Sequence, residues 1–346
     1  MTSETTAPDA PLSPPAAAVP PGPPAYHRMA RAAGRYDWWR PLAGTGLVVA
    51  GVFALMLGVF IASEVAGHLA GRPLDADGVV SWGTHADLAL SLASIAVALP
   101  VVLLAAHAVQ GRPAGTVSSV EGRLRWRRLA VCLGLALPLV LLTMAVLALL
   151  PAAPGEDGST QWAGTRAFLT GLAVLCVLVP FQAAAEEYVF RGWLLQAVGA
   201  WCRSPWLAVA PQAVLFAAAH GWGTVWGFAD LVVFGAVTGW LTVRTGGLEA
   251  AIALHVLNNL VSMGIAAAIA GALDSQETAA DMQGAAVAVD VPLVLLYAAA
   301  VVWVTRRRER LRRDCPRRER PRRERPRRER PRRECLRRAA GPAGGV

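Results

Sequence analysis

The sequence contains no lysine, and all 33 of its basic residues are arginine. Charged residues of both signs make up only 16% of its 346 residues, whereas a soluble domain carries about 25%. The hydrophobic share is 55%, gathered into long runs, which is typical of chains that cross a membrane. This shortage of charge excludes an ordinary soluble domain and indicates an integral membrane protein.

Cysteine is also sparse, and several catalytic motifs are missing. The five cysteines are scattered without zinc-ligand spacing, and their odd number argues against a disulfide framework. The sequence has no His-Glu-x-x-His, no Gly-x-Ser-x-Gly and no Gly-x-Gly-Asp. These absences exclude a zincin-type helix, a nucleophilic serine elbow and a paired-aspartate intramembrane site.

Eight apolar runs are each near the roughly 20 residues that cross about 30 Å of hydrocarbon, and in lipid such runs must be helical. We therefore predict an all-α, polytopic transmembrane bundle of about eight helices between disordered N- and C-terminal tails. The predicted spans cover residues 42–63, 86–109, 129–151, 167–187, 205–220, 223–243, 249–270 and 291–305. The predicted divisions are a disordered N-terminus at 1–40, N-terminal membrane helices at 41–160, a catalytic core at 161–272, a last loop and helix at 273–305, and an Arg-rich tail at 306–346.

Arginines fall on alternate loops between these spans, while acidic residues gather on the intervening loops. The arginines that flank spans are Arg28, Arg31, Arg35, Arg40, Arg123, Arg125, Arg127, Arg128, Arg203 and Arg244, followed by the tail. Because basic residues concentrate on the cytoplasmic side, we predict a multi-pass protein of the cell membrane with both termini cytoplasmic.

The two ends of the chain have unusual compositions. Residues 1–26 are rich in Pro, Ala, Ser and Thr, which cannot build a core and predicts disorder. Residues 306–346 hold 19 arginines and six acidic residues, with a Pro-Arg-Arg-Glu-Arg repeat from Pro316. A proline at every fifth position prevents a regular helix. We expect this arm to contact anionic lipid headgroups, with nucleic acid the less favoured partner.

Two adjacent glutamates lie in the fourth predicted span. Glu187 and Arg191 are one helical turn apart and share a face, so they can form an ion pair that neutralises both charges. Glu186 is rotated by about 100° from Glu187, which leaves it free of that pair. Because an unpaired charge at the membrane centre costs about 2.5–3.5 kcal/mol, Glu186 is predicted to act as a general base.

Two histidines lie in other apolar runs. His220 follows Phe216 by one helical turn, and His255 precedes Asn259 by one turn. Taken alone, a histidine near a helix end, such as His220, is usually a satisfied polar residue. The pair of His255 and Asn259 is as well explained by an interhelical hydrogen bond. Asn259 has three possible roles, to orient the imidazole, to hold a metal or to bind a substrate oxygen. Together with the glutamates, the histidines supply the groups that activate water, or that hold zinc with one position open.

Three motifs, each with a spacing of four residues in its key pair, occur in order within residues 165–270. They are Glu186-Glu187-x-x-x-Arg191, Phe216-x-x-x-His220 and His255-x-x-x-Asn259. This set resembles the motifs of the CPBP family, which covers type II CAAX prenyl proteases and bacteriocin-processing, Abi-like proteins. The stretch from Gly235 to Gly247 also resembles the family's approach to its last motif. The resemblance implies an all-helical intramembrane endopeptidase in which Glu187 and Arg191 support the site.

The resemblance also implies roles for the remaining motif residues. Glu186 and His220 would activate the attacking water, and His255 and Asn259 would complete the site as metal ligands or oxyanion stabilisers. Two alternatives follow for the cofactor. Either a divalent metal, with zinc favoured, is held by Glu186, His220, His255 and Asn259, or the mechanism is metal-free and based on glutamate. The expected substrate is a membrane peptide or a lipid-anchored protein.

An alternative interpretation is a non-catalytic membrane protein, such as a bacteriocin immunity factor, scaffold or transporter, that keeps the motifs for packing. The simple spans also contain a conflict, because they place His220 on the opposite side of the membrane from Glu186 and His255. The conflict is removed if the fourth span continues to about residue 199, if residues 188–204 re-enter the membrane, or if the fifth span is steeply tilted. Asp230, in the sixth span, has either an arginine partner or a place in a polar cavity.

Overall fold

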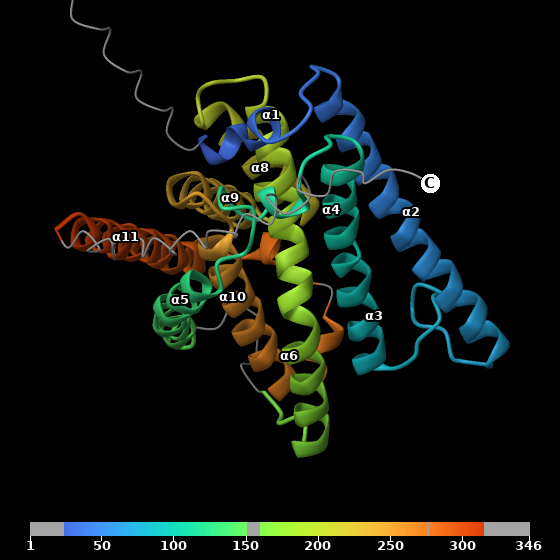
Figure 1. The fold of residues 1–346 in the computed structure, drawn as a ribbon. Helices are drawn as coiled ribbons and strands as arrows, with labels where there is room; N and C mark the ends of the chain where they lie inside the picture. The colour runs from blue at the N-terminus through green and yellow to red at the C-terminus, as the bar shows by residue number, and fades with distance from the viewer. Residues whose placement is uncertain (1–23, 151–159, 276, 315–346) are drawn as a thin grey trace, which may run out of the picture. The chain divides into compact units, whose positions relative to one another are not determined.

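The computed structural model describes residues 24–150, 160–275 and 277–314, and these are mostly helical (Figure 1). Within those ranges there is no β-strand, only three isolated bridges such as Ser119 with Gly247. The helices are η1 (Tyr26–Arg28), α1 (Met29–Ala32), α2 (Arg40–Leu69), α3 (Thr84–Ala96), α4 (Ala98–Ala108), η2 (Ala114–Thr116), α5 (Trp126–Leu147), α6 (Thr165–Glu187), η3 (Tyr188–Leu194), α7 (Leu195–Gly199), α8 (Trp206–Ala219), α9 (Val225–Thr245), α10 (Glu249–Ala268), η4 (Ala272–Asp274), η5 (Ala279–Asp281) and α11 (Gly284–Asp314). The predicted all-α class is confirmed.

Seven helical stretches among the described residues are long and apolar enough to cross a membrane. They are Arg40–Leu69, Thr84–Ala108, Trp126–Leu147, Thr165–Gly199, Val225–Thr245, Glu249–Ala268 and Gly284–Arg310. The fifth predicted span corresponds to α8, which has 14 residues and is about 21 Å long at 1.5 Å per residue. Helix α8 is therefore too short to cross about 30 Å of hydrocarbon alone, and the cytoplasmic placement of both termini stays a prediction.

The fourth span is much longer than the predicted 167–187. Helix α6, the π-helical turn η3 and α7 form one continuous stretch from Thr165 to Gly199, 35 residues long. This is the first of the three solutions to the conflict over His220. Helix α8 returns alongside η3 and α7, so its C-terminal end reaches the level of Glu186 without crossing the whole membrane. In Figure 1, α6 runs between α10 on one side and α3 on the other, and both pack against it.

The predicted disorder over 1–40 is wrong for the residues of η1 and α1. Tyr26 is fully buried and donates a hydrogen bond from its hydroxyl to the carbonyl of Val117. Arg28 Nη1 donates to the carbonyl of Cys202 at 2.9 Å, just past the end of α7. An aromatic anchor and bonds to carbonyls near a helix C-terminus hold this segment. Residues 1–23 lie outside the described part of the chain.

The Arg-rich tail is also helical at its start. Helix α11 continues through Asp314, because the first proline of the repeat comes only at Pro316. The helix therefore continues past residue 305, the predicted end of the last span, and the tail boundary at residue 306 stays a prediction. The repeat itself, with its expected contact to anionic lipid, lies outside the described residues, as does the loop with Glu156 and Asp157.

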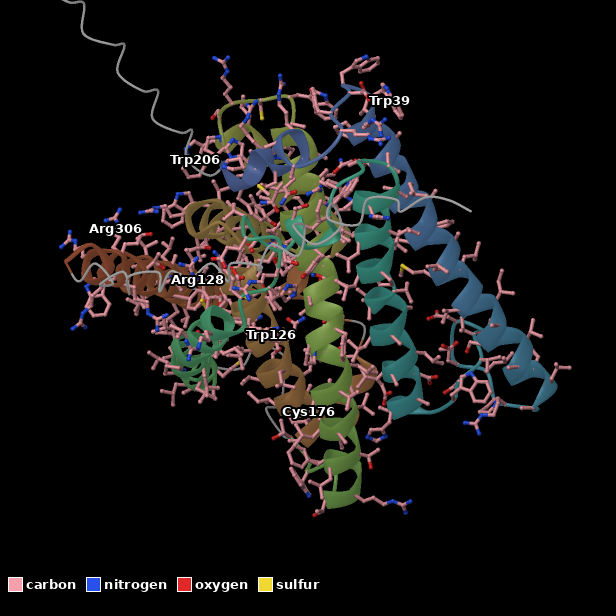
Figure 2. The ribbon with its side chains drawn as sticks, in the orientation of Figure 1. Trp39, Trp126, Arg128, Cys176, Trp206 and Arg306 are labelled. Atoms are coloured by element: carbon pink, nitrogen blue, oxygen red, sulfur yellow. The ribbon has the colours of Figure 1, made fainter. Side chains whose placement is uncertain are left out.

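Exposed tryptophans mark one end of the helices. Trp39 at the start of α2 is 44% exposed, and Trp206 at the start of α8 is 59% exposed. Figure 2 shows both at the same end of the molecule. Tryptophan is enriched where a bilayer meets water, so this end has the composition of a membrane interface.

A part-buried ion pair holds the turn before α10. Arg125 donates from Nε to Glu249 Oε1 at 2.8 Å and from Nη2 to Glu249 Oε2 at 2.6 Å, a bidentate arrangement. Burial alone would lower the pKa of Arg125, but the hydrogen bonds and charge of Glu249 outweigh it and raise that pKa above its usual value. Glu249 is the first residue of α10 and is fully buried, so the pair sets where the helix that carries His255 begins.

Helix α2 packs against the π-helical turn through Gly44. A Cβ at Gly44 would overlap the ring of Trp193, whereas a Cβ at Gly46 would meet nothing within 4 Å. Trp193 is 1% exposed and donates from Nε1 to Thr45 Oγ1 at 3.0 Å. We expect Gly44→Val to lower the free energy of unfolding by about 1–3 kcal/mol through overpacking, with Gly46→Val as the matched control. Unfolding in mixed detergent micelles measures both, and equal stabilities would contradict this packing.

Candidate active site

Side chains from α6, α8 and α10 converge on one carboxylate oxygen. Glu186 Oε2 lies 3.8 Å from His220 Nε2 and 3.7 Å from His255 Nε2. The three residues are separated in sequence by 34 and 35 positions, so only the packing of three helices brings them together. The predicted convergence of Glu186 with both imidazoles is therefore present in the fold.

The carboxylate of Glu187 contacts two neighbouring side chains. Its Oε1 lies 2.7 Å from His255 Nδ1 and 3.1 Å from Arg191 Nη1. Glu187 and Arg191 are both fully buried, which is tolerated because each neutralises the other. The predicted pairing within one helical turn is therefore found in the structure. The contact of Glu187 with His255 was not predicted, and it gives the imidazole a fixed orientation.

Helix α9 completes the surroundings of Arg191. Arg191 Nε donates to Thr238 Oγ1 at 3.1 Å, and its guanidinium carbon lies 3.9 Å above the centre of the Phe216 ring. Phe234, on the same helix as Thr238, stacks on Phe216 with ring centres 5.8 Å apart. A cation over the face of an aromatic ring is stabilised by the electrons of that ring. Thr238 lies in the stretch from Gly235 to Gly247, but nothing in that pattern singled it out.

The hydrogen bonds of the two histidines set their tautomers. His220 Nδ1 lies 2.9 Å from the carbonyl oxygen of Phe216, and a carbonyl only accepts. His255 Nδ1 faces the carboxylate of Glu187, which also accepts when ionised. We therefore assign the proton of each neutral ring to Nδ1. Both Nε2 atoms then present lone pairs toward Glu186 Oε2, so three acceptors face one another.

A glutamine that sequence reasoning missed joins Glu186 to Asn259. Gln182 Nε2 donates to Glu186 Oε1 at 2.5 Å, and Asn259 Nδ2 donates to Gln182 Oε1 at 3.2 Å. The signal was available, because Gln182 precedes Glu186 by one helical turn in an apolar run. Of the roles open to Asn259, orientation of the imidazole belongs instead to Glu187.

The π-helical turn begins directly after Glu187. Residues Tyr188–Leu194 form it, and such turns recur at functional sites because they change the register of side chains along a helix. Tyr188, its first residue, exchanges a hydrogen bond of 2.6 Å with Ser118 through the two hydroxyl groups. This contact ties the turn to the segment before α5.

Exposure divides the site into a closed side and an open side. The side chains of Glu187 and Arg191 are 0% exposed and that of His255 is 4% exposed. Glu186 and His220 are 14% and 23% exposed. The open side of the site is therefore the side with Glu186 and His220.

The donor set suits zinc in chemical type, since two imidazoles and a carboxylate are frequent zinc ligands. The arrangement does not fit one as it stands. Among the described residues, no group of three or more His, Cys, Asp or Glu side chains could hold a metal ion. Glu186 Oε2 is buried and accepts no hydrogen bond from a described residue. The metal-ligand role of Glu186, His220, His255 and Asn259 stays a prediction.

Two other features lie apart from this cluster. Asp230 on α9 is 5% exposed and lies close enough to Asp290 on α11 for the two charges to interact. Among the described residues no ion pair joins it to an arginine. A cavity of about 900 Å³ lies between α2 and α3 and reaches α10 at Met263, one turn beyond Asn259. None of the six candidate residues lines it, so the polar convergence and not the cavity defines the site.

The fold and the site together define an all-helical membrane protein with a carboxylate–imidazole centre among its helices. Residues 166–261, which include all six candidate residues, match the family model described as type II CAAX prenyl endopeptidase Rce1-like. The uncharacterized protein YyaK of Bacillus subtilis (strain 168) is 30% identical over 225 residues, which are 63% of this chain and 73% of that protein. No solved structure gives a significant match. The chain belongs to the Rce1-like family.

Proposed function

We propose that this protein is an intramembrane endopeptidase that hydrolyses a peptide bond by general-base catalysis at Glu186. The observation that carries the proposal is the convergence of Glu186 Oε2 with His220 Nε2 and His255 Nε2 at 3.8 and 3.7 Å. Three acceptors in one place require a donor between them, and water supplies two protons. Family membership supports an endopeptidase in general.

The reaction needs one proton acceptor and an oriented water. As the water oxygen bonds to the carbonyl carbon of the peptide, Glu186 takes one of its protons. When the carbon–nitrogen bond breaks, that proton passes to the leaving nitrogen, and the products are a carboxylic acid and an amine. The water has two hydrogens, so one faces Glu186 and the other is donated to His220 Nε2 or His255 Nε2, which orients the water. Glu187 and Arg191 hold His255 in place from the closed side.

The substrate proposed for this site is a membrane peptide or a lipid-anchored protein. Glu186, His220 and His255 lie on helices of a bundle with seven candidate membrane spans among its described residues, so the scissile bond must approach through or beside lipid. CAAX processing and bacteriocin maturation both meet this condition. Zinc would supply a Lewis acid if the cluster tightened around it, but the arrangement described above does not require it, and no step here depends on it.

The test is cleavage of lipid-anchored and transmembrane reporter peptides by the purified protein in liposomes, read by mass spectrometry. We expect His220→Ala to lower kcat/KM by roughly 10²–10⁴-fold, because it removes a group that orients the attacking water. His107→Ala is the matched control, since His107 is exposed on α4, outside the cluster. Equal rates for the two variants would contradict the proposal and favour a non-catalytic membrane protein that keeps the motifs for packing.

A further inference from the structure

The side chain of Gln182 donates one hydrogen bond and accepts another. It donates from Nε2 to Glu186 Oε1 at 2.5 Å and accepts at Oε1 from Asn259 Nδ2 at 3.2 Å. The side chain is 5% exposed, so water competes little for either bond. Gln182 and Glu186 lie on one face of α6, and Asn259 lies on α10.

The charge of Glu186 decides the orientation of both amides. A carboxylate only accepts hydrogen bonds, so the amide nitrogen of Gln182 must face Glu186. Its oxygen then faces Asn259, which must turn its own nitrogen toward Gln182. The bond to Glu186 Oε1 also fixes the rotation of the carboxylate. The second oxygen, Oε2, is thereby directed at the two imidazoles.

We infer that Gln182 is a positioning residue of the proposed peptidase, which sets the rotation of the Glu186 carboxylate and the orientation of the Asn259 amide. The inference rests on the proposed function, and it adds a residue that the three motifs do not contain. Through this one side chain the amide of α10 is oriented relative to the base on α6. Asn259 uses one N–H for its bond to Gln182. Its Oδ1 and its second N–H take no part in that bond.

The first arm of the test needs no activity. The chain has only two asparagines, Asn258 and Asn259, so selective ¹⁵N-asparagine labelling gives two side-chain amide signals in nuclear magnetic resonance spectra. Asn259→Asp assigns them. Gln182→Leu removes the acceptor and should move the Asn259 signal while the Asn258 signal stays. Gln182→Glu keeps an acceptor for Asn259 and should move it less. An unmoved Asn259 signal in Gln182→Leu overturns the inference.

The second arm is kinetic. We expect Gln182→Leu and Gln182→Glu to lower kcat by roughly 10- to 100-fold with KM nearly unchanged, because each removes a hydrogen bond donated to a charged base. Gln212→Leu is the control: Gln212 is equally buried, and its amide donates only to the backbone carbonyls of Val209 and Gly235. If all three variants lost activity to the same extent, the cause would be a general loss of packing. That result would overturn a positioning role for Gln182.

The two proposals fail separately. If Glu186→Gln abolishes cleavage but Gln182→Leu leaves kcat unchanged, the inference about Gln182 is wrong and the proposed function stands. If Glu186→Gln leaves cleavage intact, the proposed function is wrong, and with it the catalytic importance of Gln182, even where the Asn259 signal moves.

Discussion

Glu186→Gln should reduce peptide cleavage by at least about 10³-fold while the protein still folds. The amide has the shape of the carboxylate but cannot take a proton from water, so the general-base contribution of roughly 10²–10⁴-fold is lost. The effect should approach the upper end of that range, because no other carboxylate replaces Glu186. Glu187, its sequence neighbour, already contacts His255 and Arg191.

Stability should not fall with activity in this variant. Glu186 Oε2 is buried and accepts no hydrogen bond from a described residue, and burying an uncompensated charge is costly. Removal of that charge should leave the free energy of unfolding unchanged or slightly higher. The measurements are initial rates on a membrane-anchored reporter and unfolding in mixed micelles, with Asp290→Asn on α11 as a second acid-to-amide change. A rate for Glu186→Gln within tenfold of the wild type would exclude Glu186 as the base.

Arg191→Met should destabilise the fold by about 3–5 kcal/mol, the usual cost of breaking a buried ion pair from one side. Glu187 would remain fully buried without its cation, 3.1 Å from the former guanidinium nitrogen. The site would also lose the hydrogen bond to Thr238 and the contact with the Phe216 ring. Denaturation with sodium dodecyl sulfate, together with the yield of extracted protein, measures the loss.

The double variant Glu187→Gln with Arg191→Met separates charge from packing. Neutralising both partners removes the uncompensated charge, and the amide oxygen of the new glutamine can still accept from His255 Nδ1. We therefore expect the double variant to recover more than half of the stability lost by Arg191→Met, with a coupling energy of about 0.5–3 kcal/mol between the two positions. The free energy of unfolding of Arg191→Met decides the matter. A value within about 1 kcal/mol of the wild type would show that the ion pair is not desolvated, because breaking a desolvated pair from one side is strongly destabilising.

Contacts between residues of the same helix could be predicted from the sequence, because they follow from the helical period. A separation of four residues places Glu187 and Arg191 on one helical face, and the structure shows them in contact. The same periodicity separates Glu186 from that face, and the two glutamates do have different partners. Gln182 obeys the rule as well, but a neutral amide in an apolar run costs less than a charge and was not singled out.

The lengths of the elements were harder to predict. Pro180 lies inside α6 and Pro211 inside α8, yet neither ends its helix. The positions of the prolines therefore did not predict where these helices end. The π-helical turn lets the fourth span continue to Gly199, and it has no signal in the pattern of apolar residues. Near the N-terminus, the hydroxyl of the buried Tyr26 donates a hydrogen bond to the carbonyl of Val117, 91 positions away. Composition alone carries no information about such a contact.

The sequence by itself determined the all-helical class of this protein, the approximate places of seven of its eight predicted spans and the helical face that Glu187 shares with Arg191. Length, apolarity and the high cost of charge in lipid act on each segment independently of its neighbours. Only the tertiary structure decided which oxygen meets which nitrogen. Glu187 orients His255, Gln182 aligns Asn259, and Glu186 keeps one oxygen for the two imidazoles. These contacts join different helices, and they depend on how side chains pack across helix interfaces, which the periodicity of a single helix does not specify.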